Sequence, residues 1–268
     1  MQLFYRKFGQ GQPVIILHGL YGSSDNWVTV GKKLADNFEV FLIDQRNHGK
    51  SPHSAYHNYE LMKNDLLEFM DEHFIKKAVI IGHSMGGKTA MFFSLDFPER
   101  LNSLIVIDIS PKSYLNLTDY SPLAIKHLNI INAMLSIDFS LVKKRNDADS
   151  VLAKTINSVI QRQFLLKNIH RDKNNNFSWK LNIEAIRNNL PDILDGLNKN
   201  ISEENKTTDF PVLFIKGENS DYIQKKDYTL IRNIFPYADI KVIKNASHWV
   251  LAEKPIELIN IISEFIHR

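Results

Sequence analysis

The sequence predicts an α/β fold, in which a mostly parallel sheet carries helices on both faces and a helical lid is inserted before the last two strands. Three observations support this prediction. Apolar runs of strand length alternate with segments of helical spacing up to about Pro111. From there to about Asn205 the spacing is helical, and the sequence gives no convincing strand. After Pro211 the alternation of strand and helix resumes.

The first half of the sequence provides most of the expected sheet. Short apolar runs that end at turn residues predict strands at 14–17, 38–43, 78–81 and 104–107, and the alternation within 1–12 is that of a further short strand. Apolar residues that recur every three or four positions predict helices at 24–37, 59–73 and 85–96. Because strands and helices alternate, we expect neighbouring strands to run parallel with the helices packed on both faces.

The second half contains the insertion and the end of the sheet. We expect residues 112–205 to form a helical lid over the carboxyl edge of the sheet, and residues 1–111 and 206–268 to form the core domain. The polar run 171–176 is expected to be a turn between two lid helices. Strands at 212–216 and 240–243 and a closing helix at 255–267 then complete the core.

The composition argues against several classes of protein. The 268 residues include no cysteine, which excludes disulfides, thiolate nucleophiles and cysteine-ligated metals. The net charge is +3, and Lys and Arg are spread along the chain, so we expect a solvated surface and no nucleic-acid partner. No apolar run approaches the ~20 residues that cross a bilayer, and the start lacks a signal-peptide run. We therefore expect a cytoplasmic protein without a membrane span.

The most informative motif is G-x-S-x-G at residues 82–86, between an expected strand and an expected helix. A sharp turn there lifts the Ser84 hydroxyl clear of the sheet, and side chains at Gly82 and Gly86 would collide with neighbouring backbone. Ser84 is therefore the expected nucleophile. One alternative is a bystander serine in a glycine-rich turn. Another is a phosphate-binding loop, whose last residues Gly87, Lys88 and Thr89 resemble.

A serine nucleophile that attacks a carbonyl needs hydrogen-bond donors for the oxygen that becomes negative. The amide N–H of Met85, directly after the serine, is one expected donor. The second is expected from the loop at 18–22, which follows an earlier strand and contains two glycines. Leu20 is the candidate donor in that loop. We expect His18 to be a structural histidine that hydrogen-bonds to backbone.

The general base is expected late in the sequence, because the chain order for this arrangement is serine, acid, histidine. His248 lies between the last expected strand and the last expected helix. The only later histidine, His267, falls at the end of that helix. His248 is therefore the expected base. The alternative is a loop histidine with no catalytic partner.

Carboxylates at two positions compete to orient the imidazole of His248. Asp108 ends the strand after the nucleophile strand, whereas Asp221 lies in the loop after the next strand. The usual acid site is that later loop, but its spacing falls on Ser220, one residue before Asp221. We favour Asp108 on these grounds, with Asp221 as the alternative and Glu218 as a weaker one. Asp108 can also be read as a helix cap or turn former.

These stretches together resemble the bacterial esterase YbfF group of α/β-hydrolases over nearly the whole chain. The resemblance rests on residues 18–22, 44–51, 82–87, 107–111, 219–220 and 247–248. It implies an α/β-hydrolase sheet of eight mostly parallel strands, and activity on short-chain esters and acyl-CoA thioesters. It also implies that Asp108 is the acid, with Ser220 at the usual acid position. Asp44 and Arg46 resemble structural residues of that family, and a substrate role for Arg46 is the alternative.

The expected function is that of a serine hydrolase that forms an acyl-enzyme. Ser84, Asp108 and His248 are the expected catalytic residues, and the amides of Leu20 and Met85 are the expected oxyanion hole. The expected substrate is a small acyl ester or an acyl-CoA, and this chemistry requires no metal or cofactor. Two alternatives stay open: a C–C bond hydrolase or perhydrolase with the same triad, and a ligand-binding protein that has lost turnover.

Overall fold

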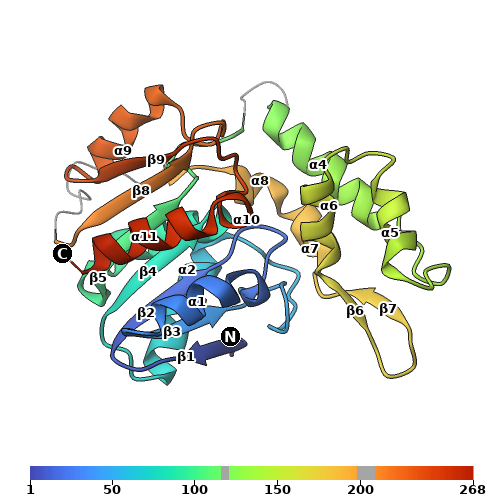
Figure 1. Ribbon diagram of the computed structural model, residues 1–268, viewed down its shortest axis with the longest axis horizontal. Coiled ribbons are helices and arrows are strands. Elements are labelled where there is room, and N and C mark those ends of the chain that lie inside the picture. Colours follow the sequence, from blue (N-terminus) through green and yellow to red (C-terminus); the bar gives the residue numbers. More distant parts are fainter. Residues whose placement is uncertain (116–120, 198–208, 268) are drawn as a thin grey trace.

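Seven strands form one sheet at the centre of the protein (Figure 1). The computed structural model describes residues 1–115, 121–197 and 209–267. In their order across the sheet, the strands are β1 (Tyr5–Phe8), β3 (Phe38–Ile43), β2 (Gln12–Leu17), β4 (Ala78–His83), β5 (Leu101–Ile107), β8 (Val212–Gly217) and β9 (Asp239–Ile243).

All neighbouring strands run parallel except β1, which pairs antiparallel with β3. The predicted α/β class is therefore confirmed, and the inserted helices do precede the last two strands, β8 and β9. The number of strands differs from the eight that the family resemblance implied. The described residues form seven strands in this sheet, and each lies in a segment that the sequence predicts as a strand.

Helices cover both faces of the sheet. One face packs against α1 (Val28–Leu34) and α11 (Pro255–Ile266). The other packs against α2 (Tyr59–Glu72), α3 (Met85–Asp96) and α9 (Tyr228–Ile234). Shorter elements lie in the connections: η1 (Ser24–Trp27), η2 (Pro98–Arg100), η5 (Lys225–Asp227) and α10 (Val250–Glu253).

The central strands β2, β4 and β5 each contain an unbroken apolar run because both faces of the sheet are buried there. In β2, Val14 and Ile16 pack in the cluster under α1 and α11, whereas Ile15 and Leu17 pack in the cluster on the opposite face. Each such side chain contributes about 1.5–3 kcal/mol when it is fully buried. Strands buried on both faces therefore appear in the sequence as unbroken apolar runs rather than as alternating ones.

Residues 121–197, which we call the cap segment, lie beyond the carboxyl ends of the parallel strands (Figure 1). Three of its helices have an N-cap residue whose side chain accepts a hydrogen bond from the backbone N–H three residues later. These N-cap residues are Ser121, Ser158 and Asn182. The helices of the segment are α4 (Pro122–Leu135), α5 (Arg145–Leu152), α6 (Val159–Leu166), α7 (Ile183–Asn188) and α8 (Leu190–Leu194).

The cap segment also contains a β-hairpin, which the sequence did not predict. Strands β6 (Ile169–Arg171) and β7 (Phe177–Trp179) pair antiparallel across the polar run that we expected to join two helices. The carboxylate of Asp172 accepts from the backbone N–H groups of Asn174 and Asn176, and Asn175 adopts a left-handed φ of 65°. Strands of three residues are too short to produce a readable alternation, so the expectation of helices was wrong here.

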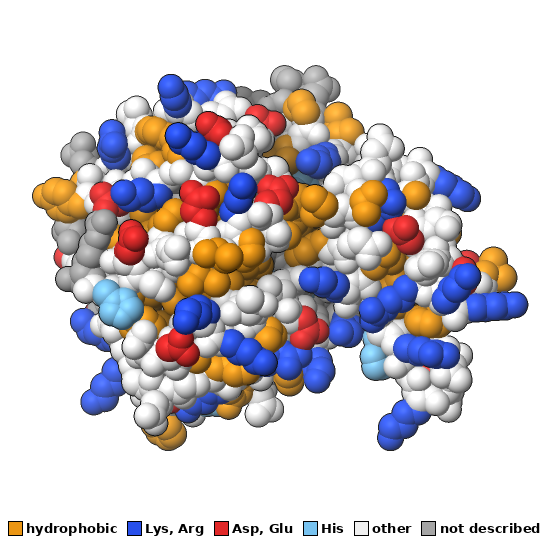
Figure 2. Space-filling view, viewed as in Figure 1, with side chains coloured by type: hydrophobic (Ala, Val, Ile, Leu, Met, Phe, Trp, Pro, Cys, Tyr) orange, Lys and Arg blue, Asp and Glu red, His pale blue; other side chains and the backbone are white. Residues whose placement is uncertain are grey.

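Charged side chains are dispersed over the face of the molecule that Figure 2 shows. Figure 2 shows Lys and Arg over both the sheet side and the cap segment, with Asp and Glu among them. This distribution is that of a solvated surface, as the sequence led us to expect. None of the helices in the described residues combines a bilayer-spanning length with sufficient hydrophobicity.

A buried lysine joins α3 to the two connections between the sheet and the cap segment. Lys88 is fully buried, and its Nζ donates to the carbonyl oxygens of Lys112, at 3.0 Å, and of Asp195. The two connections lie side by side there, because Leu197 N donates to Pro111 O at 2.9 Å. Burial lowers the pKa of Lys88 to about 7.

We expect this lysine to make the protein more stable as the pH rises from about 7 to 10. An unfolded lysine keeps its proton until about pH 10.5, whereas the pKa of folded Lys88 is about 7. Between these values the unfolded state binds one more proton, so the free energy of unfolding rises by up to about 1.4 kcal/mol per pH unit. Urea unfolding at several pH values measures this slope. Lys88→Met should lack it, and equal slopes in both proteins would contradict the prediction.

Candidate active site

Ser84 occupies a strained turn between β4 and α3. Its φ of 51° and ψ of −118° lie where residues with side chains are uncommon, and it is the N-cap residue of α3. The flanking glycines are sterically required. A Cβ on Gly82 would lie 2.2 Å from the carbonyl oxygen of Gly86, and a Cβ on Gly86 would lie 2.4 Å from that of Leu17. The turn therefore has the geometry that the G-x-S-x-G motif predicts.

Three side chains from separate loops form one hydrogen-bonded chain. His248 Nε2 lies 3.1 Å from Ser84 Oγ, and His248 Nδ1 lies 2.8 Å from Asp108 Oδ2. The loops follow β4, β5 and β9, whose carboxyl ends meet at one edge of the sheet. The carboxylate accepts the Nδ1–H, which leaves the lone pair of Nε2 directed at the serine hydroxyl.

Asp108 is the carboxylate that the structure brings to His248. Its side chain is fully buried, its Oδ1 accepts from Gly217 N at 2.9 Å, and its Oδ2 also accepts from Ser220 Oγ. Asp221, by contrast, is exposed and makes no hydrogen bond to the imidazole in the described structure. The geometry thus favours Asp108, although sequence spacing alone had left Asp221 open.

Glu218, the weaker candidate, is also directed elsewhere. Its Oε2 accepts from Asn245 N at 2.9 Å, so it supports the loop that carries the histidine. Two further neighbours of His248 were not foreseen. The ring of Tyr222 stacks on the imidazole with centroids 3.6 Å apart, and His83 Nε2 lies 3.1 Å from the carbonyl oxygen of His248. These contacts join distant loops, and neither has a spacing that a single sequence reveals.

The loop at 18–22 lies against the serine turn. A Cβ on Gly19 would be 2.8 Å from His83 Nδ1 and 3.1 Å from Ser84 Cβ, so a side chain there would force His83 or the loop to move. Leu20 lines the same pocket as Ser84, and Met85 begins α3 directly after it. In the described residues, neither the Leu20 nor the Met85 amide donates to another backbone carbonyl. The hydrogen bonds of the described residues thus assign neither N–H group a protein acceptor.

The histidine of this loop has a structural role, as expected. His18 is buried, its Nδ1 bonds to the carbonyl oxygen of Gly19 at 2.9 Å, and its Nε2 accepts from Gln45 N at 3.0 Å. Burial lowers its pKa, which favours the neutral ring that these two bonds require. Asp44 is structural too, because its carboxylate accepts from Ser24 N at 2.6 Å and from Lys50 N at 2.9 Å.

Arg46 forms a buried ion pair with Asp65 in α2. Its Nε and Nη2 donate to the two carboxylate oxygens at 2.6 and 2.8 Å, and both side chains are almost completely buried. This fork-shaped contact ties the loop after β3 to α2. It occupies the guanidinium and favours the structural role that we expected over the substrate role.

We expect Asp65→Asn to lower the free energy of unfolding by about 3–5 kcal/mol, because it leaves the buried Arg46 guanidinium without its counter-charge. In Arg46→Met/Asp65→Leu no unpaired charge is left behind, so this double variant should be the more stable of the two. Urea unfolding measures both effects. If Arg46 binds substrate instead, the double variant should show a raised KM at normal stability.

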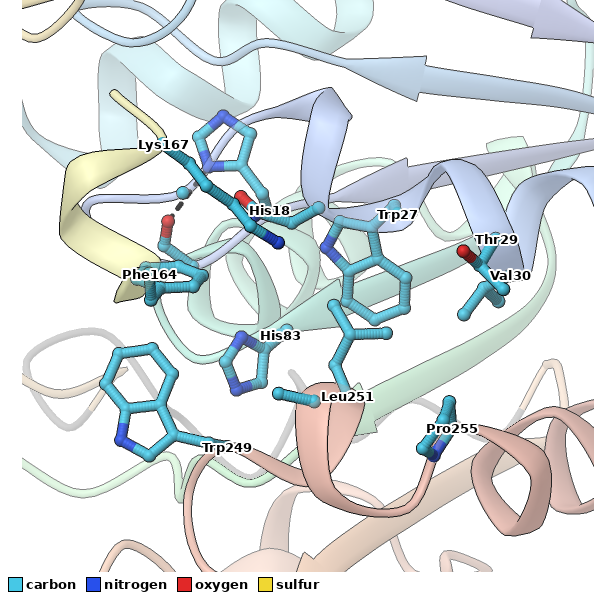
Figure 3. A pocket seen from close by; sticks show the side chains of 14 residues that line it. His18, Trp27, Thr29, Val30, His83, Phe164, Lys167, Trp249, Leu251 and Pro255 are labelled. Atoms are coloured by element: carbon cyan, nitrogen blue, oxygen red, sulfur yellow. Dashed lines mark hydrogen bonds between the residues drawn. The ribbon is translucent and has the colours of Figure 1, made fainter. Parts of the chain in front are cut away.

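Two of the pockets near Ser84 and His248 share lining residues. The smaller, of about 30 Å³, lies over Ser84 and is bounded by residues of α4 and α6. The larger, of about 210 Å³, is lined mainly by apolar side chains, including Trp27, Leu251 and Phe164 (Figure 3). His83 and Trp249 line both pockets. A substrate bound at Ser84 therefore has an adjoining apolar space for one of its arms.

Comparison with known proteins agrees with this geometry. Residues 12–255 match the family described as the alpha/beta hydrolase fold. The chain is 39% identical to the sn-1-specific diacylglycerol lipase ABHD11 of Danio rerio, over 96% of this chain and 79% of that protein. It is 32% identical to the esterase YbfF of Escherichia coli, over 95% of this chain and 93% of that protein.

A solved structure described as a marine microorganism esterase superposes with a TM-score of 0.93. Its sequence is 45% identical, and the match covers 98% of this chain and 99% of that one. The resemblance that the sequence motifs suggested is confirmed. The chain belongs to the α/β-hydrolase fold family, within the group that includes the esterase YbfF.

Proposed function

We propose that this protein is a serine hydrolase that cleaves small carboxylic esters or acyl thioesters, including acyl-CoA, through an acyl-enzyme intermediate. The observation that carries the proposal is the hydrogen-bonded chain from Ser84 through His248 to the buried Asp108, with contacts of 3.1 and 2.8 Å. The names of the relatives, two esterases and a diacylglycerol lipase, support an acyl ester as the substrate.

In the first half of the proposed reaction, Ser84 Oγ attacks the acyl carbonyl while its proton moves to His248 Nε2. Asp108 holds the Nδ1–H and stabilises the imidazolium that forms. The carbonyl oxygen becomes negative, and the amides of Leu20 and Met85 donate to it. Each of these donors contributes about 3–4 kcal/mol to the stability of the transition state. When the tetrahedral intermediate collapses, Nε2 gives its proton to the departing alcohol or thiol.

In the second half, water replaces the leaving group. His248 Nε2 removes a proton from this water, which attacks the acyl carbonyl on Ser84. The same two amides stabilise the second oxyanion. Its collapse breaks the bond to Ser84 Oγ, which takes the proton back from the imidazole. The products are a carboxylic acid and the free enzyme.

The proposed domain organisation serves this reaction. We propose a core of residues 1–111 and 206–268 that carries the catalytic groups, and a lid of residues 112–205 whose boundary with the core at 205/206 lies outside the described residues. Phe164 of α6 and Trp249, which directly follows the proposed base, pack against each other with ring centroids 4.5 Å apart. Because both rings line the larger apolar pocket, we propose that this pocket holds the acyl or alcohol arm of the substrate.

Two measurements test the proposal. A fluorophosphonate probe should label the folded protein, because it reacts with an activated serine. Rates should then be measured with p-nitrophenyl esters and with acyl-CoAs of increasing chain length. We expect rates well above background for short esters and a chain-length optimum in at least one series. A folded protein that is neither labelled nor active on any of these substrates would contradict the proposal.

A further inference from the structure

The cap side of the pocket over Ser84 carries an amide that has no partner. Gln161 of α6 lines this pocket, and only 8% of its surface is exposed. Among the described residues, none accepts from its side-chain amide or donates to it, whereas its backbone N–H donates to Ser158 Oγ. A buried amide is normally hydrogen-bonded, so an unpaired one that faces a pocket indicates a contact with a ligand.

The side-chain amide of Gln161 does not bond to the nearest local partner, the backbone N–H of the N-cap residue of α6. Ser158 is the N-cap residue of α6, and its Oγ accepts from Gln161 N at 3.3 Å. In a complete capping box, the glutamine side chain would return this bond to the N–H of Ser158. Here it instead lines the pocket. The side chain therefore forgoes a local bond and keeps its donor and acceptor free beside the proposed nucleophile.

A second free donor follows from the hydrogen bonds of His127 in α4. Its Nδ1 lies 3.2 Å from Tyr21 Oη, and its Nε2 lies 3.1 Å from Tyr222 Oη. Burial lowers the pKa of His127 to about 3, so the ring is neutral and has one N–H and one lone pair. It donates to one tyrosine and accepts from the other. The tyrosine that it donates to keeps its own O–H, which no described residue accepts.

These side chains line the pocket with uncharged hydrogen-bonding groups. The donors are the Gln161 NH₂ group and a tyrosine O–H, and the acceptor is the Gln161 side-chain oxygen. Gln161, Tyr21 and Tyr222 all line the pocket together with Ser84. No carboxylate lines it, and its one ammonium, that of Lys126, belongs to an exposed residue. A buried carboxylate on the substrate would therefore lack a buried counter-charge, whereas a hydroxyl oxygen would match the donors and the acceptor.

We propose that the preferred substrate carries a neutral hydroxyl group a few bonds from the scissile carbonyl, and that Gln161 on the cap segment recognises it. This inference rests on the proposed function and makes it more specific. Gln161 is then a specificity-determining residue, because a site built to hydrogen-bond a hydroxyl rejects the analogue that lacks it. Tyr21 and Tyr222 supply the additional O–H donor. A purely hydrocarbon ester would leave these buried groups unpaired.

Two pairs of esters test the proposal, each of which exchanges a hydroxyl for a methyl of similar size. Methyl 3-hydroxybutanoate and methyl 3-methylbutanoate vary the acyl side, and 2-hydroxyethyl butanoate and propyl butanoate vary the alcohol side. In the wild type, we expect the hydroxyl ester of at least one pair to have a kcat/KM about tenfold higher or more. In Gln161→Met, the ratio for that pair should fall to within about threefold of one.

Gln163→Met is the matched control, because Gln163 is an exposed glutamine on the same helix. It should keep the wild-type ratio. Equal kcat/KM values within both pairs in the wild type, or a preference that survives Gln161→Met, would overturn the inference. The same four esters are titrated calorimetrically into the inactive variant Ser84→Ala. The ratio of Kd values within each pair then measures the preference for the hydroxyl ester without turnover. Binding preference without hydrolysis would contradict only the proposed function, and hydrolysis without preference only this inference.

Discussion

Replacing Ser84 with alanine is expected to reduce kcat for ester hydrolysis by about 10⁶-fold. The reason is that Oγ is the only atom in the proposed mechanism that bonds covalently to the acyl group. His248 Nε2, 3.1 Å away, would lose the group whose proton it removes, and the imidazole alone does not replace it. Hydrolysis of a p-nitrophenyl ester and fluorophosphonate labelling both measure the loss.

The same substitution should leave the fold intact. The serine hydroxyl hydrogen-bonds only to His248 among the described residues, and alanine is smaller, so no clash is introduced at the strained turn. The urea midpoint should stay close to that of the wild type. Ser178→Ala, at an exposed serine of β7, is the matched control and should keep full activity. Activity of Ser84→Ala within tenfold of the wild type would exclude Ser84 as the nucleophile.

The parts of this site that follow from local patterns could be predicted from the sequence. The turn at Ser84 requires glycines at fixed spacing, and those glycines are visible in the sequence because backbone atoms lie 2.2–2.4 Å from where their Cβ atoms would be. The central strands could be located because burial on both faces forces apolar runs. His248 could be chosen because it follows the last such run.

The contacts between loops could not be predicted in this way. Whether Asp108 or Asp221 faces the imidazole depends on where the loop after β5 and the loop after β8 direct these two side chains. His127 contacts Tyr21 and Tyr222, which lie about one hundred residues before and after it in the sequence. No sequence periodicity predicts contacts over such separations. Gln161 likewise reads as an ordinary residue in the first turn of a helix. Its position becomes informative only when the cap segment is placed over the serine.

Asp108→Asn is expected to reduce kcat by about 10⁴-fold with little change in structure. Gly217 N donates to Oδ1 of Asp108, so the oxygen of the new amide should remain on that side and its NH₂ group should face His248. The imidazole would then have to offer a lone pair at Nδ1 and would carry its proton on Nε2. In that tautomer Nε2 cannot accept the proton of Ser84, although all the heavy atoms stay in place. Asparagine also tolerates the left-handed φ of 51° at this position.

Asp221→Asn is the comparison that makes this result diagnostic, because it removes the same charge from the rival carboxylate. Asp221 is exposed and lies outside the hydrogen-bonded chain, so we expect its kcat to stay within about twofold of the wild type. A reversed outcome, with Asp221→Asn inactive and Asp108→Asn active, would make Asp221 the acid and would require the loop after β8 to rearrange during turnover. We expect Asp108→Asn to be far less active than Asp221→Asn only because the buried Asp108 carboxylate selects the tautomer of His248. Hydrogen bonds from Gly217 and Ser220 hold that carboxylate in place.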